Sequence, residues 1–114
     1  MQITTGIDIV EVADFKTRIS RSKSLKERLF TKLEIESCKS RGIEHLASRF
    51  AAKEAYAKAS GAKLLKWHDV EIRNLQSGKP VISVKNIPVK IKSIDLSISQ
   101  TRKIIVAIVV ILWK

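Results

Sequence analysis

The sequence predicts an α+β fold: an N-terminal strand, several helices including one long central helix, and then an antiparallel meander of strands. Residues 2–11 are rich in β-branched types and predict a strand, whereas residues 12–60 are helical by composition. The last third alternates polar and apolar residues with period two, as half-buried strands do. The chain has 114 residues, so we expect a single domain over 1–114.

Two signals predict helix ends in the middle of the chain. Thr31 and Glu34 have the spacing of a capping box, in which the hydroxyl accepts from one free N–H and the carboxylate reaches back to the cap. The run Ile43–Ser60 is rich in alanine and contains neither proline nor glycine, so it should be the longest helix. Gly61 follows as its stop signal.

The last third contains a series of strand and turn signals. Residues 68–73 alternate with period two, residues 77–80 indicate a turn, and residues 81–84 a short strand. Ile94, Leu96 and Ile98 share one face of another strand. The apolar run Ile104–Trp113 is about half of the roughly 20 residues that span a bilayer. We therefore expect it to be a buried strand rather than a membrane anchor.

The charge is strongly positive, with 22 Lys and Arg against 11 Asp and Glu, a net of +11. Such a surface attracts nucleic acid, an anionic membrane, a phosphorylated small molecule or an acidic protein, and composition does not choose among them. Cys38 is the only cysteine, so no internal disulfide can form. With no secretion signal visible, we expect a reducing, cytoplasmic location.

Two acids stand among apolar neighbours. Asp8 lies within Ile7-Asp8-Ile9-Val10, and Glu54 falls on the apolar stripe of the long helix. Each has a simpler explanation when taken alone: a strand end or backbone bond for Asp8, and an i,i+4 pair with Lys58 for Glu54. Taken together, two carboxylates on two rigid elements could hold one Mg²⁺, which binds one or two carboxylates, waters and substrate phosphates.

Basic residues accompany Glu54 on the same helix. Arg49, Lys53 and Lys58 could clamp the remaining phosphate charge, although a solvated helix face is the commoner fate of such residues. The spacing alone does not show that Asp8 and Glu54 meet.

Several segments together resemble one family, the bacterial holo-acyl-carrier-protein synthases, which are 4′-phosphopantetheinyl transferases. They occur in the family's order in a chain of the right length: Gly6–Glu11, Phe30-Thr31 with Glu34, Arg49–Ala55 with Lys58, Gly78-Lys79-Pro80 and Leu96–Ser99. The resemblance covers nearly the whole chain.

The resemblance implies a homotrimer with active sites at subunit interfaces, and it implies roles for individual residues. Asp8 and Glu54 correspond to Mg²⁺ ligands, and Glu54 and Lys58 to catalytic positions. The implied coenzyme A contacts are Arg49, Phe50, Lys53, Gly78, Lys79, Pro80 and Gln100. For Gly78-Lys79-Pro80 a plain turn remains an equal alternative.

The implied reaction moves 4′-phosphopantetheine from coenzyme A to a serine of apo acyl carrier protein and releases 3′,5′-ADP, in support of fatty acid biosynthesis. Lys58 would stabilise the leaving group, and Glu54 would take the serine proton, directly or through a metal-bound water. Acyl carrier proteins are acidic, so a basic docking face is expected. The docking candidates are Lys16, Arg18, Arg21, Lys23, Lys26 and Arg28.

The chain departs from the family at four places, one of which is a final strand more apolar than expected. Gln100 stands where histidine is usual, Asp14 where a basic residue is common, and residues 61–67 form a shorter segment with less glycine. An inactive homologue that binds coenzyme A is therefore one alternative. The other is a small basic nucleic-acid-binding protein, which the aromatic content of 5% and the lack of zinc-finger spacing disfavour. We expect neither nucleic acid nor membrane as a partner.

Overall fold

A computed structural model describes residues 1–62 and 65–114, and its elements confirm the predicted α+β class. In chain order they are β1 (Ile3–Glu11), α1 (Val12–Arg21), α2 (Lys23–Leu29), α3 (Lys32–Cys38), α4 (Ile43–Ser60), the 3₁₀ turn η1 (Trp67–Asp69), β2 (Val70–Asn74), β3 (Pro80–Val84), β4 (Ile91–Gln100) and β5 (Ile104–Trp113). The predicted segment at 61–67 includes residues 63–64, which lie outside the described part.

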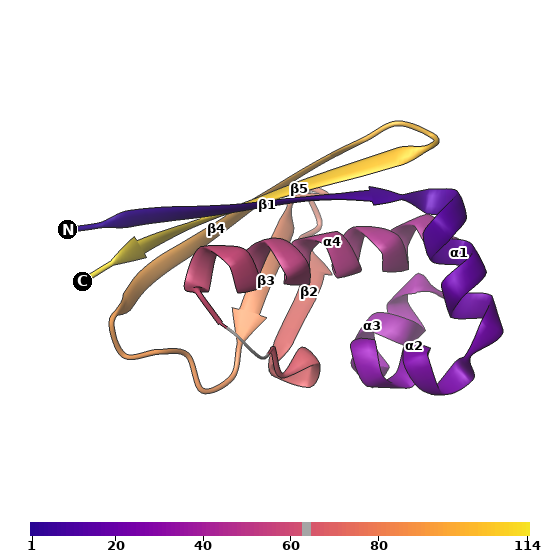
Figure 1. The fold of residues 1–114 in the computed structure, drawn as a ribbon, viewed down its shortest axis with the longest axis horizontal. Helices are drawn as coiled ribbons and strands as arrows, with labels where there is room; N and C mark the ends of the chain where they lie inside the picture. Colours follow the sequence, from indigo (N-terminus) through magenta and orange to yellow (C-terminus); the bar gives the residue numbers. More distant parts are fainter. Residues whose placement is uncertain (63–64) are drawn as a thin grey trace.

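The strands form two antiparallel sheets. One has the order β1-β5-β4, and the other is the β2–β3 hairpin. Figure 1 shows α4 running along the three-stranded sheet, with α1, α2 and α3 gathered beyond one end of α4. The N-terminal strand pairs with the C-terminal strand, and Asp8 lies opposite Ala107.

The core lies between α4 and one face of the three-stranded sheet. Alternate residues of β5 point into it and are fully buried: Ile105, Ala107, Val109 and Ile111. On α4 the facing residues include Ala51 and Ala55, whose small side chains let the helix approach the sheet. The prediction of a buried last strand is therefore right for one face, whereas Ile108 on the other face is 38% exposed.

Gly6 is the point of closest approach between β1 and α4. A Cβ at this position would collide with the carbonyl oxygen of Ala55, so only glycine fits. Nearby, the Thr4 hydroxyl donates to the carbonyl of Ala59 at 2.7 Å. These contacts fix the register of the strand against the helix, and Asp8, two residues after Gly6, consequently faces α4.

The predicted helix ends agree with the structure. The backbone N–H of Glu34 donates to the Thr31 hydroxyl at 3.2 Å, and the N–H of Thr31 donates to the Glu34 carboxylate at 3.0 Å. Helix α4 ends at Ser60, and the next residue, Gly61, adopts a left-handed φ of 73°. The strand expected from residue 68 begins instead at Val70, because the N–H of Asp69 bonds back to the carbonyl of Lys66 and closes a 3₁₀ turn.

The face of the sheet turned away from α4 is open and apolar. Ile3, Ile7 and Ile9 on β1 are 65%, 57% and 65% exposed, and Ile7 pairs with Ile108 on β5. Within residues 1–62 and 65–114, no helix is both long enough and apolar enough to cross a membrane.

Candidate active site

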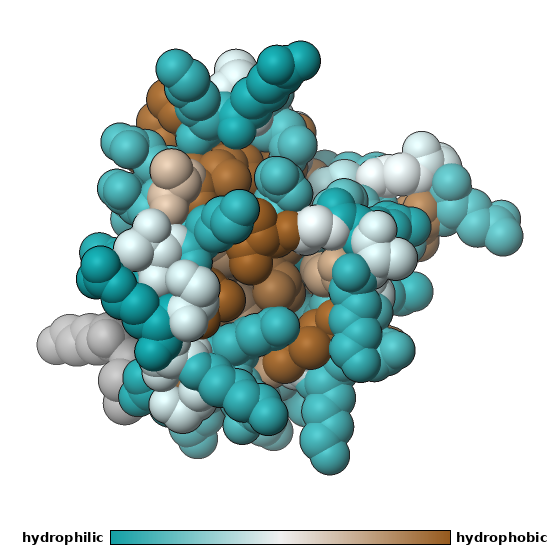
Figure 2. Space-filling view, turned by 90° about the vertical axis from the view of Figure 1, so that its right-hand side faces the viewer, coloured by the Kyte–Doolittle hydropathy of each residue, from teal (hydrophilic) through white to brown (hydrophobic). Residues whose placement is uncertain are grey.

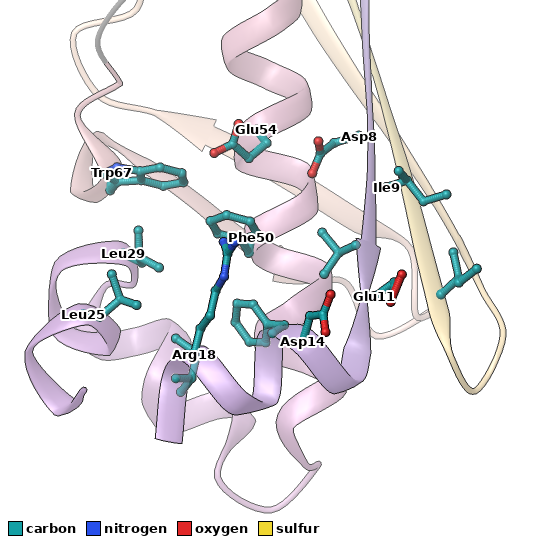
Figure 3. A pocket seen from close by; sticks show the side chains of 14 residues that line it. Asp8, Ile9, Glu11, Asp14, Arg18, Leu25, Leu29, Phe50, Glu54 and Trp67 are labelled. Carbon is teal, nitrogen blue, oxygen red and sulfur yellow. The ribbon is translucent and has the colours of Figure 1, made fainter. Parts of the chain in front are cut away.

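A cavity of about 570 Å³ lies where β1, α1, α2 and α4 meet. Its lining is divided by chemistry, as Figure 3 shows. Asp8, Glu11, Asp14 and Glu54 lie toward β1, beside Ile9, and Leu25, Leu29 and Trp67 lie across the cavity from them, with Phe50 between. Phe15 and Ile19 also belong to the lining. Among the described residues, Arg18 is the one positively charged side chain in this lining.

The two acids singled out from the sequence meet in this cavity. Asp8 comes from β1 and Glu54 from α4, and both are partly buried. The pKa of Glu54 is raised above its usual value, first by burial and then by the negative charge of Asp8, and Lys58 offsets part of this shift. The two carboxylates therefore line the same cavity, and the charge of Asp8 disfavours ionisation of Glu54.

Lys58 stands at the open edge of this acidic pair. Its ammonium donates to the carbonyl of Ile7 at 2.8 Å and to the Asp8 carboxylate at 3.3 Å. The side chain remains 55% exposed, so the ammonium can still reach a ligand. The predicted grouping of Asp8, Glu54 and Lys58 is thus present in space.

The acidic pair has the donor chemistry that suits Mg²⁺. Two carboxylates from rigid elements, with open volume beside them, leave positions for waters and for phosphate oxygens. Across the described residues, no group of three or more His, Cys, Asp or Glu side chains is arranged to hold a metal ion by itself. The ligand set of any cation here would therefore be completed by substrate and water.

The apolar side of the cavity is built around an aromatic stack. The Phe50 and Trp67 rings lie 5.5 Å apart and within 9° of parallel, and Phe15 packs 5.6 Å from Phe50. Figure 2 looks at the end of the molecule that carries α1–α3 and shows apolar surface there, framed by hydrophilic side chains. We call Leu29, Phe50 and Trp67 the apolar wall. Of these three residues, only Phe50 was predicted as a site residue. Trp67 could have been suspected because it is a tryptophan that soon follows the long helix.

Lys53 is absent from the lining of this cavity, as far as the chain is described. Its side chain is completely buried, and its ammonium donates to Glu34, to the carbonyl of Leu29 and to the carbonyl of Trp67. Burial lowers the pKa of Lys53, and the charge of Glu34 partly opposes that shift. The predicted contact of Lys53 with a coenzyme A phosphate stays a prediction, and the structure shows its ammonium bonded to protein acceptors.

Of the other predicted coenzyme A contacts, Arg49, Gly78, Lys79 and Pro80 lie at or near the β2–β3 turn, whereas Gln100 lies at the turn between β4 and β5. Arg49 is 3% exposed and donates to the side chains of Ser48 and Asn74, while Asn74 donates to the carbonyl of Gly78 at 2.9 Å. The ammonium of Lys79 bonds Asp95 at 3.2 Å. Pro80 begins β3 and Gln100 ends β4. As far as the chain is described, these residues are not in the lining of the acidic cavity.

Fold and site together define a class of small α+β enzyme, in which an acidic pair from a strand and a helix stands beside an apolar wall. The chain belongs to the 4′-phosphopantetheinyl transferase superfamily, whose family model matches residues 4–109.

Within this superfamily, the chain is similar to individual holo-[acyl-carrier-protein] synthases. The chain is 45% identical over 103 residues to the holo-[acyl-carrier-protein] synthase of Geobacter sulfurreducens. This match covers 85% of this chain and 81% of the relative. It is 40% identical to that of Chloroherpeton thalassium over 93% of this chain and 94% of the relative.

Solved structures agree with this placement. The Helicobacter pylori holo-[acyl-carrier-protein] synthase in complex with coenzyme A superposes with a TM-score of 0.86 at 30% identity, over 95% of this chain and 99% of that one. The Bacillus anthracis synthase in complex with CoA (3′,5′-ADP) superposes with a TM-score of 0.83 at 33% identity, over 97% and 96%.

Proposed function

We propose that this chain is a holo-acyl-carrier-protein synthase that transfers 4′-phosphopantetheine from coenzyme A to a serine of an acidic acyl carrier protein. The observation that carries the proposal is that Asp8 and Glu54 line one cavity and that the Lys58 ammonium bonds Asp8, in a chain of this superfamily. The serine oxygen attacks the phosphorus that bears pantetheine, the bond from that phosphorus to the 3′,5′-ADP oxygen breaks, and the serine proton is removed.

Asp8 and Glu54 would hold Mg²⁺, which supplies charge neutralisation at the pyrophosphate when bound. The chain's own contribution is to fix both carboxylates before substrate arrives. Gly6 lets β1 lie directly against α4, so Asp8 and Glu54 are placed by contact between two regular elements. Such preorganisation is the main source of catalysis in phosphoryl transfer.

Glu54 and Lys58 have complementary proton and charge roles. Glu54 would remove the serine proton, directly or through a metal-bound water. Lys58 keeps an exposed ammonium next to Asp8, where it can stabilise negative charge on the departing 3′,5′-ADP.

The two sides of the cavity fit the two chemistries of coenzyme A. Its pyrophosphate carries the charge, whereas its pantetheine arm is uncharged. With the pyrophosphate at the acidic pair and its cation, the arm would lie along the apolar wall of Leu29, Phe50 and Trp67. The nucleotide would extend from the pyrophosphate towards residues outside this wall.

The surface beside the cavity is basic, which suits an acidic carrier. Lys16, Lys23 and Lys26 surround a shallow hollow formed by α1, α2 and the start of α4. Complementary charge of this kind speeds encounter and loses its effect as salt is added. Asp14 interrupts the basic character at the cavity itself.

The open face of the sheet suits assembly of several copies, and we infer a cytoplasmic homotrimer. Ile3, Ile7 and Ile9 form an exposed apolar strip, and exposed apolar patches commonly mark sites where proteins associate. β1 carries these side chains on one face and Asp8 on the other, so an interface here would adjoin the site.

The test is a transfer assay with the purified protein, coenzyme A, Mg²⁺ and an apo acyl carrier protein, followed by the mass of the carrier. We expect a mass gain equal to phosphopantetheine, which is lost on chelation of Mg²⁺ and in Asp8→Asn. No gain, on a carrier that another synthase modifies in parallel, would contradict the proposal. In that case binding of coenzyme A without transfer would identify an inactive homologue.

A further inference from the structure

A buried ammonium lies behind the cavity and ties its apolar wall together. We propose that Lys53 is a positioning residue: it holds Leu29 and Trp67 in place relative to Glu54 and makes no contact with substrate phosphate. The inference rests on the proposed function for its kinetic test, while its structural test is independent of any activity.

The Lys53 ammonium has all of its donors occupied. It lies 2.6 Å from Glu34 Oε1, 2.9 Å from the carbonyl of Leu29 and 3.0 Å from the carbonyl of Trp67. A lysine has three N–H donors, so three acceptors saturate it. Because the side chain is also 0% exposed, no donor remains for a phosphate.

Two of these three acceptors belong to the apolar wall. Leu29 is the last residue of α2 and Trp67 is the first residue of η1, and both side chains line the cavity. The Leu29 carbonyl lies at the C-terminal end of α2, where carbonyls lack intrahelical donors, whereas the Trp67 carbonyl also accepts from the N–H of Val70. The ammonium therefore supplies the partner that holds both segments against α4.

The third member of the wall is on α4 itself. Phe50 lies one turn before Lys53, and its ring stacks on Trp67. Glu54 follows Lys53 directly and faces the cavity. One turn of α4 thus carries the wall's stacking partner, the wall's tie and a member of the acidic pair, so the wall and the acidic pair are positioned by the same helix.

Glu34 makes this arrangement rigid. Its Oε1 accepts from the N–H of Thr31 and from Lys53, and its Oε2 accepts from the N–H of Ile72 at 2.9 Å. The Phe30 ring lies with its centroid 5.4 Å from the Lys53 ammonium. A buried charge with this many partners has one favourable geometry, because any displacement leaves charged or polar atoms unpaired.

The kinetic test uses two ligands that differ in the pantetheine arm. Coenzyme A carries the arm, whereas 3′,5′-ADP has the nucleotide phosphates without it. One variant is Lys53→Met, which leaves the Glu34 carboxylate buried without its counter-charge. The other is the double variant Glu34→Gln with Lys53→Met, which removes both buried charges and should therefore stay folded. We expect KM for coenzyme A to rise roughly tenfold or more, because a displaced wall misplaces the arm. Inhibition by 3′,5′-ADP should stay within about twofold of the parent.

The opposite pattern overturns the proposal. Equal weakening of coenzyme A and 3′,5′-ADP would mean that Lys53 contacts a phosphate, and an unchanged KM for coenzyme A in the folded double variant would mean that the wall does not depend on it. The control is Lys39→Met, which removes an exposed pair with Glu36 at 3.0 Å. It should change neither ligand's constant.

The structural test reads Trp67 directly and needs no substrate. In a Trp113→Phe background Trp67 is the remaining tryptophan. We expect a red shift and a change in intensity of its emission in the folded double variant, because the stack on Phe50 loosens. Unchanged emission would overturn the positioning role. If the parent protein transferred nothing, the proposed function would fail while this measurement would still decide the role of Lys53.

Discussion

Two lysines one turn and a half apart on α4 have opposite environments. Lys53 is fully buried and bonds a carboxylate that has no exposed surface, whereas the Lys58 side chain is 55% exposed and bonds Asp8 at the edge of a cavity. The first pair connects α2, α3, β2 and η1 to the helix. The second pair keeps a cation next to the acidic pair. The same residue type is therefore buried among protein acceptors on one side of the helix and exposed beside two carboxylates on the other.

Glu34→Ala should have the largest effect, and the effect should be on stability. It leaves the Lys53 ammonium buried without its counter-charge and frees the N–H groups of Thr31 and Ile72. We expect a loss of about 3–5 kcal/mol in the free energy of unfolding, measured by urea denaturation. Glu36→Ala, in an exposed pair with Lys39, is the matched control and should cost less than about 1 kcal/mol. Equal effects in the two variants would contradict the architectural role of the buried pair.

Glu54→Gln should have the next largest effect, and it should be on activity. The amide keeps the shape of the side chain but can neither bind a cation as a carboxylate does nor accept the serine proton. We expect transfer to fall on the order of 100-fold or more with the fold intact, followed by the mass of the carrier and by circular dichroism. A near-normal rate would remove both roles from Glu54.

Lys58→Met should give a smaller loss of transfer, about tenfold, because other charges still act on the leaving group. Its effect on the free energy of unfolding should stay below about 1 kcal/mol, since the Lys58 side chain is more than half exposed and its pair with Asp8 is open to water on that side. Rate and stability are measured on the same preparation. A stability loss comparable to that of Glu34→Ala would mean that the Lys58–Asp8 pair stabilises the fold as much as the buried Lys53–Glu34 pair does, which would contradict the contrast between them.

The smallest effect concerns the pH dependence of stability. The folded-state pKa of Glu54 is raised, so its ionised form is disfavoured by folding. Without divalent metal, this cost is absent below the unfolded-state pKa and is fully present once the pH exceeds the raised folded-state value. Glu54→Gln should therefore be more stable than the parent at neutral pH and equal to it in acid. Added Mg²⁺ should stabilise only the parent, as thermal unfolding in both conditions would reveal.

The elements were predictable from the sequence because their signals are local. Glu34 lies three residues from Thr31, so its capping role was visible in the spacing, and the same holds for the end of α4 at Gly61. Asp8 and Glu54 were recognisable as acids among apolar neighbours. Their meeting in space was left open by the spacing, because it depends on the close packing of β1 on α4 at Gly6.

The task of Lys53 could not be predicted in this way. On a helical wheel it is a cation next to Glu54, and its partner Glu34 had already been assigned to a cap. A carboxylate can accept several hydrogen bonds, so one glutamate caps α3 and neutralises Lys53 as well. Trp67 was missed for a related reason, because its stacking on Phe50 joins segments that are not adjacent in sequence.

The saturated ammonium of Lys53 has a consequence for chemical labelling. Amine-selective reagents need a free, solvent-accessible nitrogen, and Lys53 offers neither while its three acceptors and its burial persist. Lys58 and Lys39 would react in the native protein, whereas Lys53 would react only after the chain opens around it. The rate at which this one amine acquires label would thus measure how often the molecule unfolds under native conditions.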